Sequence, residues 1–230
     1  MTGVVRGSLN ATFVALLPKT SDPSTFNDFR PIALCNFVYK VLLKLIALRM
    51  NDVLMRHISK EQFSFLGDRQ IFDVVGIAQE SLHSAKIKNR KSLFLKLDLK
   101  KAYDRINWNF LRMLLIQVGL KWEVVQWTMG CISSASSAIL INGSPTSFFR
   151  RKRGIRQGCP LSPFLFLLVI EALSTLLGKA ARDGSFKGLK VCSSLSLTHL
   201  IFVDDVLIRG WIRNRIGLLS RNCCRTFVGP

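Results

Sequence analysis

The sequence predicts an α+β domain, and three observations support that fold class. Apolar residues recur at helical spacing from Phe37 to about His57, whereas leucines alternate with other residues from Leu93 to Leu99. Asn142-Gly143, a dipeptide suited to a tight hairpin turn, follows a β-prone run. These signals interleave without the regular alternation of a parallel doubly wound sheet. With 230 residues, 49% of them hydrophobic, the chain can hold a core without disulfide or metal cross-links.

In chain order, the first predicted element is an amphipathic helix over residues 37–57, with basic residues between its apolar ones. A strand over residues 93–99 follows. If its leucines face the core, Asp98 points from the opposite face, where a carboxylate can meet solvent and substrate. The next element is a helix over residues 108–118, which Gly119 closes.

Two hairpins are predicted further along the chain. A strand over residues 138–141 leads into the Asn142-Gly143 turn. Two short β-prone runs, residues 200–203 and 206–208, flank Asp204-Asp205. The second hairpin is therefore expected to carry two carboxylates at its tip.

A long apolar stretch over residues 161–178 raises the question of a membrane span. It contains Pro163 and Glu171, and a charge at bilayer depth costs at least about 2.5 kcal/mol. A buried helix that starts close to Pro163 and ends at Gly178 or Gly184 suits the same residues better. We therefore expect no membrane partner.

The composition indicates a polyanionic partner. Thirty-three Lys and Arg residues against fourteen Asp and Glu residues give a net charge of +19, which is typical of proteins that bind nucleic acid or an anionic membrane surface. The six cysteines include no Cys-x-x-Cys pair, and the chain has three histidines, so a structural zinc site is poorly supported. A reduced, intracellular compartment is the simpler interpretation, and nothing at the N-terminus marks secretion.

Two groups of carboxylates are attached to apolar strands, Asp98 with Asp104 and Asp204 with Asp205. Adjacent carboxylates repel each other unless something neutralises them. In one interpretation they are only a strand end and a polar turn. In the other, Asp98 and Asp204 meet on neighbouring strand ends and hold divalent ions, Mg²⁺ being the expected cation for oxygen ligands. Two such ions would activate an attacking hydroxyl and stabilise a departing pyrophosphate.

Several motifs favour the second interpretation. They are Arg30-Pro31-Ile32, Leu97-Asp98-x-x-x-Ala102-Tyr103-Asp104, the run GIRQGCPLSP from Gly154 to Pro163, and Phe202-Val203-Asp204-Asp205. These motifs occur in the order expected of a reverse transcriptase. Further matches are Leu17-Pro18-Lys19, Asp28-Phe29, Lys100-Lys101, Arg105 and Gly143. The sequence closely resembles the polymerase of non-LTR (LINE-type) retrotransposons, particularly the plant lineage, over approximately residues 13 to 208.

This resemblance implies a right-hand polymerase with fingers and palm, an antiparallel palm sheet backed by helices, and no thumb. Asp98 and Asp204 resemble the catalytic, metal-binding aspartates of the palm, and Asp205 completes the pair. The implied cofactors are two Mg²⁺ ions, for which Mn²⁺ can substitute, with no other small-molecule cofactor. Tyr103 falls where the family places an aromatic that packs beneath the sugar and excludes a 2′-hydroxyl.

The implied partners are an RNA template, a DNA primer and deoxynucleoside triphosphates. Gln157 and Gly158 resemble the loop that touches the incoming nucleotide and template, while Lys19 and Arg30 resemble residues that meet the triphosphate. A solvated basic side chain is the alternative for Lys19. The basic residues expected to track the template backbone, with a solvated hairpin arm as the alternative, are Arg150, Arg151, Lys152, Arg153 and Arg156.

The resemblance also predicts how the chain is organised. Residues 1–90 would be fingers-like, residues 91–210 a palm with a returning segment at about 120–155, and residues 211–230 a divergent tail. Twenty-five residues follow Asp205, and the run from Arg209 departs from the usual pattern toward further palm strands and a thumb. Since a thumb holds primer and template, we expect a truncated copy with impaired activity.

Three functions stay open at this point. The favoured one is an RNA-directed DNA polymerase, by template-directed nucleotidyl transfer. The second is a catalytically inactive nucleic-acid-binding remnant of a retroelement. The third, a maturase-like RNA-folding protein, is disfavoured because the metal-binding aspartates are present. Nuclear residence is expected from the life cycle of such an element, and the basic runs are compatible with nuclear import.

Overall fold

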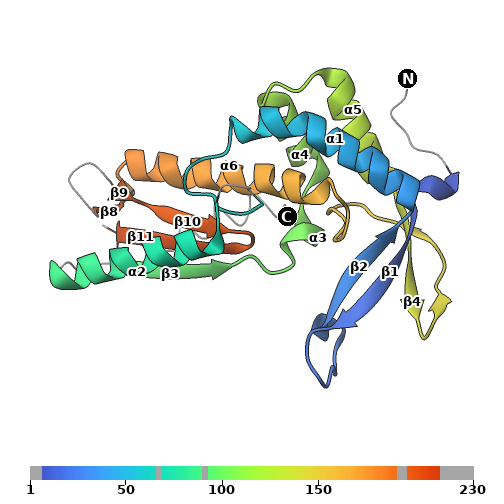
Figure 1. Ribbon diagram of the computed structural model, residues 1–230, viewed down its shortest axis with the longest axis horizontal. Helices are drawn as coiled ribbons and strands as arrows, with labels where there is room; N and C mark the ends of the chain where they lie inside the picture. Colours follow the sequence, from blue (N-terminus) through green and yellow to red (C-terminus); the bar gives the residue numbers. More distant parts are fainter. Residues whose placement is uncertain (1–6, 66–68, 90–92, 191–195, 213–230) are drawn as a thin grey trace. The chain divides into compact units, whose positions relative to one another are not determined.

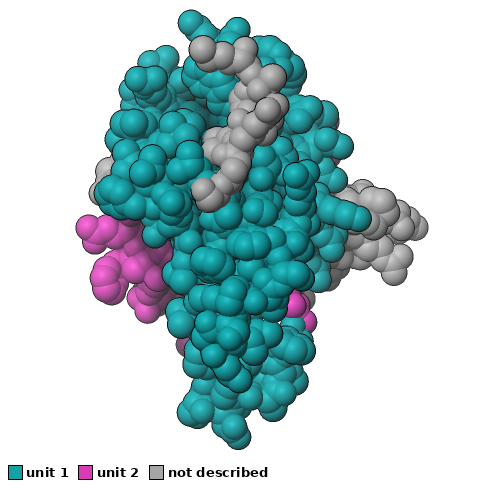
Figure 2. Space-filling model, turned by 90° about the vertical axis from the view of Figure 1, so that its right-hand side faces the viewer, with its two compact units in different colours: residues 1–56, 103–166 teal, residues 57–102, 167–230 magenta. Residues whose placement is uncertain are grey.

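The computed structural model describes residues 7–65, 69–89, 93–190 and 196–212 of the chain. The chain divides into two compact units, each made of two separate stretches (Figure 2). Unit 1 comprises residues 1–56 and 103–166, and unit 2 comprises residues 57–102 and 167–230. Because both units are discontinuous, neither coincides with the expected fingers and palm ranges, which remain a prediction.

The strands of unit 1 are β1 Ala11–Pro18, β2 Phe29–Cys35, β4 Ser136–Ile141, β5 Ser144–Pro145 and β6 Phe149–Arg150. They form a five-stranded sheet in the order β2-β1-β4-β5, with β6 also paired to β4. Strand β1 is antiparallel to β2 and parallel to β4. Between β4 and β5, Asn142 and Gly143 have φ of +49° and +81°, as a tight hairpin turn requires. The first predicted hairpin is therefore confirmed.

The helices of unit 1 are α1 Phe37–Met55, α4 Trp108–Gln117 and α5 Trp122–Ser133, with α3 Ala102–Arg105 at the unit boundary and the short 3-10 helices η1 Gly7–Asn10 and η2 Phe26–Asp28 (Figure 1). Asn36 caps α1 because its side-chain oxygen accepts a hydrogen bond from the backbone N–H of Val38 at 2.9 Å. Helix α4 is followed by Gly119 at φ +82°, as predicted. Helix α1 forms where it was predicted, but most of the periodic apolar residues do not lie on its buried face. The residues that α1 buries are Tyr39, Leu43, Ala47, Met50 and Leu54, whereas Val38, Val41, Leu42, Leu45 and Leu48 of the predicted apolar pattern are exposed.

The elements of unit 2 are α2 Ile71–Ile87, β3 Leu93–Asp98, β7 Phe186–Lys187, β8 Leu189–Lys190, β9 Ser196–Leu197, β10 His199–Phe202 and β11 Asp205–Ile212, together with most of α6 Ser162–Arg182. An antiparallel sheet has the order β10-β11-β3. Side chains alternate between its faces. Leu200 belongs to an apolar cluster against which Val74 and Ala78 of α2 pack, whereas His199 hydrogen bonds to Ser174 of α6. Helices α2 and α6 therefore cover opposite faces of this sheet (Figure 1).

Helix α6 confirms the buried helix predicted over the long apolar stretch. By length and composition alone it could cross a membrane, with a mean hydropathy of 1.8 over 18 residues, and 56% of that window is buried. Its continuous run of buried side chains is Leu165, Phe166, Leu167, Leu168, Val169 and Ile170. A helical run that is buried on all sides is typical of a protein core as well as of a membrane span.

Strand β11 is longer than the sequence predicted. The β-prone run was expected to end at Ile208, but pairing with β3 continues to Gly210 and pairing with β7 reaches Ile212. Within this extension Arg209 is completely buried, with 0% of its surface exposed. A charged residue at this position lowered the β signal of the sequence, and the ladder hydrogen bonds of two neighbouring strands nevertheless maintain the strand.

Candidate active site

The candidate catalytic carboxylates meet at one end of the β10-β11-β3 sheet. The two-residue turn between β10 and β11 consists of Val203 and Asp204, and Asp205 is the first residue of β11. Asp205 lies directly opposite Asp98 in the antiparallel register. The backbone N–H of Leu99 donates to the carbonyl of Asp204 at 3.1 Å, so the end of β3 is also joined to the turn. The structure thus brings the three predicted aspartates together at the backbone level.

Strand register also decides which face these side chains share. Residues directly opposite in a ladder point to the same face, so Asp98 and Asp205 lie on the α2 side of the sheet with Leu207 and Arg209. Helix α2 covers the far end of this face, where the Arg209 guanidinium donates to the carbonyl of Ile77. The aspartate end is open, because Asp98, Asp204 and Asp205 are all exposed.

Lys96 forms an ion pair with this carboxylate group, and sequence reasoning missed it. Its Nζ lies 3.0 Å from Oδ1 of Asp205, with 68% of the lysine side chain and 51% of the aspartate side chain exposed. Such an exposed ion pair contributes less than about 1 kcal/mol to stability. The sequence spacing could have predicted this pair, because Lys96 precedes Asp98 by two positions and a strand places such residues on one face.

The donor set suits a hard divalent cation. Carboxylate oxygens are the ligands that Mg²⁺ prefers, and the three aspartates supply them from a turn and two strand ends. Among the residues described, however, no three Asp, Glu, His or Cys side chains are grouped closely enough to hold a metal ion. One of the three carboxylates is directed to Lys96 instead. The three aspartates therefore have the right ligand chemistry for the cation, and their carboxylates must move closer together to coordinate it.

A buried polar chain lies on the α6 side of the same sheet. Oε2 of Glu171 accepts hydrogen bonds from the backbone N–H and hydroxyl of Ser59, each at 3.0 Å. The Ser59 hydroxyl lies 2.9 Å from that of Ser174, which in turn lies 2.8 Å from Nε2 of His199. Burial raises the pKa of Glu171 and lowers the pKa of His199 to about 4. His199 is therefore neutral at pH 7 and serves as a structural hydrogen-bonding group.

Tyr103 lies in unit 1, packed against the start of α6. Its ring stacks on that of Phe166, with centroids 4.4 Å apart and planes inclined by 16°. Its carbonyl accepts a hydrogen bond from the N–H of Ile155 at 2.8 Å. A Cβ added to Gly154 would lie 2.7 Å from the carbonyl oxygen of Asp104, so this glycine permits the close approach of the two segments. The aromatic residue is partly exposed.

Gln157 and Gly158 lie against β2 of the same unit. The carbonyl of Gln157 accepts a hydrogen bond from the N–H of Ala33 at 2.8 Å. A Cβ added to Gly158, which has φ +89°, would lie 3.2 Å from the carbonyl oxygen of Ala33. Arg30 is exposed on β2 opposite Leu17. The loop and Arg30 therefore belong to one region of unit 1.

Lys19, just beyond the end of β1, forms hydrogen bonds within the β1–β2 hairpin. Its Nζ donates to the carbonyl of Asn27 at 2.7 Å, and its backbone N–H donates to the carbonyl of Asp28 at 2.7 Å. The lysine itself is exposed. Its side chain can therefore reach a ligand only by exchanging an intramolecular hydrogen bond.

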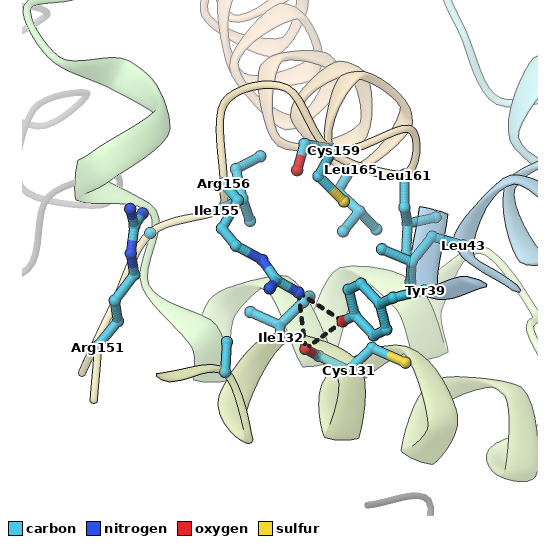
Figure 3. A pocket seen from close by; sticks show the side chains of 13 residues that line it. Tyr39, Leu43, Cys131, Ile132, Arg151, Ile155, Arg156, Cys159, Leu161 and Leu165 are labelled. Carbon is cyan, nitrogen blue, oxygen red and sulfur yellow. Dashed lines mark hydrogen bonds between the residues drawn. The ribbon is translucent and has the colours of Figure 1, made fainter. Parts of the chain in front are cut away.

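Arg156 corrects the sequence-based grouping of this residue with the surface run that precedes it. It is only 5% exposed and lines a narrow pocket of unit 1, where it points toward Tyr39 and the carbonyl of Cys131 (Figure 3). Its guanidinium donates to Oγ1 of Thr12 at 2.8 Å and to the hydroxyl of Tyr39 at 2.5 Å. Sequence position suggested a phosphate contact, but these internal acceptors occupy the side chain.

The remaining basic residues differ among themselves. Arg150, Lys152 and Arg153 are exposed, so they remain available to a polyanion. Arg151 is half-buried and faces Asp104, with 3.8 Å between a guanidinium nitrogen and a carboxylate oxygen. Burial lowers the pKa of Arg151, and Asp104 opposes that shift. The expected backbone-tracking run is thus reduced to three freely exposed cations.

Comparison with known proteins adds a family-level match. The profile of the family "Reverse transcriptase (RNA-dependent DNA polymerase)" matches residues 17–216. The chain is 35% identical over 172 residues to the transposon TX1 uncharacterized 149 kDa protein of Xenopus laevis, a match that covers 75% of this chain and 13% of that protein. It is 24% identical over 210 residues to a Pol polyprotein from a type-1 retrotransposable element R2 of Popillia japonica, covering 90% and 28%.

Telomerases are among the solved structures that share this fold. Telomerase from Candida tropicalis in complex with a fragment of telomeric RNA aligns with a TM-score of 0.62 at 15% identity, covering 96% of this chain and 38% of that one. The corresponding Candida albicans structure aligns with a TM-score of 0.60 at 14% identity, covering 95% and 40%. The chain thus spans well under half the length of these proteins, and at such identities the likeness concerns the fold alone.

Proposed function

This chain belongs to the reverse transcriptase (RNA-dependent DNA polymerase) family, and from that premise we propose that it catalyses template-directed nucleotidyl transfer on an RNA template. Its relatives are proteins of non-LTR retrotransposons of the R2 and TX1 kind. The observation that carries the proposal is the register of β3 and β11, which sets Asp98 opposite Asp205 at the open end of a sheet. Together with Asp204 in the adjoining turn, these residues present three carboxylates at the open end of the sheet.

We assign the binding of divalent cations to Asp98, Asp204 and Asp205. Magnesium bound there would lower the pKa of a primer hydroxyl and neutralise the departing pyrophosphate. The chain's own contribution is placement: the β10–β11 turn and the end of β3 are joined through the Leu99 N–H bond to Asp204. Lys96 compensates the charge of Asp205 in the absence of a cation, which limits the repulsion between neighbouring carboxylates.

We assign substrate contacts to residues of unit 1. Tyr103 has a rigid stacking partner in Phe166, which suits it to pack against a deoxyribose and to exclude a 2′-hydroxyl. Arg30, Gln157 and Gly158 would meet the incoming nucleotide, because a guanidinium grips phosphate and a glycine allows a close approach of the backbone. The primer would be DNA and the nucleotides deoxynucleoside triphosphates.

The exposed cations Arg150, Lys152 and Arg153 would contact the template backbone. Phosphate contacts are independent of sequence and weaken steeply with salt. We therefore expect RNA binding that decreases linearly on a plot of log affinity against log salt concentration. Replacing the three residues with alanine should reduce the slope by about 2 to 3, because each phosphate contact contributes about 0.9 on a duplex or about 0.7 on a single strand.

Primer extension tests the catalytic proposal. The wild-type chain is incubated with a DNA primer on an RNA template, deoxynucleoside triphosphates and Mg²⁺, beside an Asp98→Ala, Asp204→Ala double variant. A matched control replaces two other exposed aspartates, Asp22→Ala and Asp52→Ala. We expect extension by the wild type and the control and none by the active-site variant. Equal extension by all three would overturn the assignment.

The same variants distinguish the polymerase from a nucleic-acid-binding remnant. A remnant would bind RNA with the affinity of the wild type in the Asp98→Ala, Asp204→Ala variant, and no preparation would extend a primer. Binding is measured by fluorescence anisotropy on a labelled RNA at several salt concentrations. This second function would be favoured by retained binding together with a complete lack of Mg²⁺-dependent extension.

A further inference from the structure

The turn that carries the carboxylates contains a backbone conformation that its sequence disfavours. Val203 has φ +55°, in the left-handed region that β-branched residues rarely adopt. The next two residues are Asp204 and Asp205, so the conformation of Val203 decides where both carboxylates are directed. Such a conformation persists only where the surrounding structure holds it in place.

A short segment outside the β10-β11-β3 sheet holds this turn. The N–H of Ile201 in β10 donates to the carbonyl of Glu61 at 2.9 Å, and the N–H of Phe63 donates to the carbonyl of Ile201 at 3.1 Å. These two bonds form a parallel bridge between Gln62 and Ile201. They extend the sheet beyond β10 and bring Ser64 beside Val203, although the two residues are 139 positions apart in the chain.

Ser64 makes a direct bond to the strained residue. The backbone N–H of Val203 donates to Oγ of Ser64, whose residue is only 1% exposed. The hydroxyl of Ser64 in turn lies 3.4 Å from Oε1 of Gln62, so its proton is directed to Gln62 and its lone pair to Val203. A hydroxyl can serve as donor and acceptor at once, and here both capacities are used.

The segment that carries Ser64 is itself fixed. The guanidinium of Arg69 donates to the carbonyls of Ser59 at 2.6 Å and Gln62 at 2.5 Å. The same guanidinium lies over the ring of Phe63, 5.9 Å from its centroid, and Phe63 packs in a buried apolar cluster. The Ser64 hydroxyl is therefore held by a rigid loop of unit 2.

We infer that Ser64 is a positioning residue of the polymerase site, which holds the turn at Val203 so that Asp204 and Asp205 are presented beside Asp98. This inference rests on the proposed function. It adds a group that does not touch substrate or cation and acts through the backbone of the turn. Its contribution is geometric, because its hydrogen bond holds Val203 at a positive φ that valine does not adopt without such support.

One substitution and a matched control test the role of Ser64. Ser64→Ala removes the acceptor, and Ser81→Ala removes another buried serine hydroxyl, which donates to the carbonyl of Ala78 in its own helix. In primer extension with Mg²⁺, Ser64→Ala should lower kcat by about 10- to 100-fold, the usual effect of losing a group that orients a metal ligand. KM for the nucleotide should change little, and Ser81→Ala should behave as the wild type.

Rescue by glycine separates positioning from a merely structural role. Glycine adopts positive φ without a penalty, so Val203→Gly should keep the turn in place without the Ser64 bond. The Ser64→Ala, Val203→Gly double variant should then have the kcat of Val203→Gly alone, within about threefold. If Ser64→Ala alone does not fold, the comparison of the double variant with Val203→Gly still tests the inference. A tenfold or larger difference in kcat between these two variants overturns it.

Two readouts do not depend on catalysis. Hydrogen exchange of the Val203 amide should be slow in the wild type and in Ser81→Ala and fast in Ser64→Ala. Binding of Mn²⁺, followed by the electron paramagnetic resonance signal of the free ion, should weaken about tenfold in Ser64→Ala. If the wild type extends no primer, the proposed function fails while these readouts still judge the role of Ser64. Unchanged exchange and unchanged Mn²⁺ affinity would reject it.

Discussion

The buried charge of Arg209 is the feature whose removal should most increase the stability of unit 2. Its side chain is fully buried in β11, and its Nε and Nη2 have no hydrogen-bond partner among the described residues. The guanidinium donates one bond to the carbonyl of Ile77 at 3.2 Å and lies over the ring of Phe94, 5.1 Å from its centroid. Among the same residues no carboxylate pairs with it. We predict that Arg209→Met stabilises the fold.

The magnitude follows from the electrostatics of burial. Burial lowers the pKa of Arg209 from its ordinary value to about 10, so the charged form is disfavoured by about 3 kcal/mol in the folded state. Methionine loses the stacking on Phe94, worth about 1 kcal/mol, and removes the unpaired donors. We therefore expect the free energy of unfolding to rise by about 2 kcal/mol, within the range seen when buried charges are replaced by apolar residues.

Urea unfolding followed by far-ultraviolet circular dichroism measures this change at pH 7. Arg112→Met, on the exposed surface of α4, is the matched control and should change the free energy of unfolding by less than about 0.5 kcal/mol. The pH dependence gives a further check. Above about pH 10 the unfolded state binds more protons than the folded state, so the wild type gains stability there and the advantage of methionine shrinks. An Arg209→Met protein no more stable than the wild type at pH 7 would refute the reasoning.

Two further predictions concern a buried histidine and a pair of glycines. Because burial lowers the pKa of His199 from 6.5 to about 4, its contribution to stability is complete above pH 6.5 and is lost as the pH falls toward 4, by about 3 kcal/mol in total. His199→Gln should show a correspondingly smaller loss in urea unfolding between pH 7 and 4, and an unchanged pH slope would contradict this. Gly154→Ala should destabilise unit 1 by at least about 2 kcal/mol, since its φ is +81° and the added Cβ would lie 2.7 Å from a carbonyl oxygen of Asp104. Gly76→Ala in α2, where the added Cβ meets nothing within 4 Å, should instead raise the stability by about 0.5 to 1 kcal/mol. Thermal unfolding of both variants tests the contrast. A Gly154→Ala protein as stable as the Gly76→Ala protein would disprove it.

Local patterns predicted the elements well. The helical spacing between Phe37 and His57 produced α1, which begins at Phe37 and ends at Met55. The alternation from Leu93 produced β3, and Asn142-Gly143 produced its hairpin turn. Each of these signals comes from residues that lie close together in the sequence. The sequence misplaced the end of β11, because an arginine in a buried strand contradicts the usual pattern.

Burial of individual charged residues was beyond the reach of these patterns. Arg156 follows a basic run in the sequence, yet its acceptors come from Thr12 and Tyr39, at separations of 144 and 117 residues. Ser64 carries no motif, and its partner in the turn is 139 residues away. Whether a polar group is buried or satisfied depends on neighbours that arrive from distant parts of the chain, so no periodicity reports it.

The sequence by itself determined the family, the order of the motifs, the strand that ends at Asp98 and the hairpin that carries Asp204 and Asp205, because these are properties of contiguous residues and their spacing. Only the tertiary structure decided that Asp205 lies opposite Asp98, that Lys96 faces Asp205, and that a distant loop supports the turn. Strand register is a choice among alternatives that differ by one residue, and packing on both faces of the sheet selects one of them.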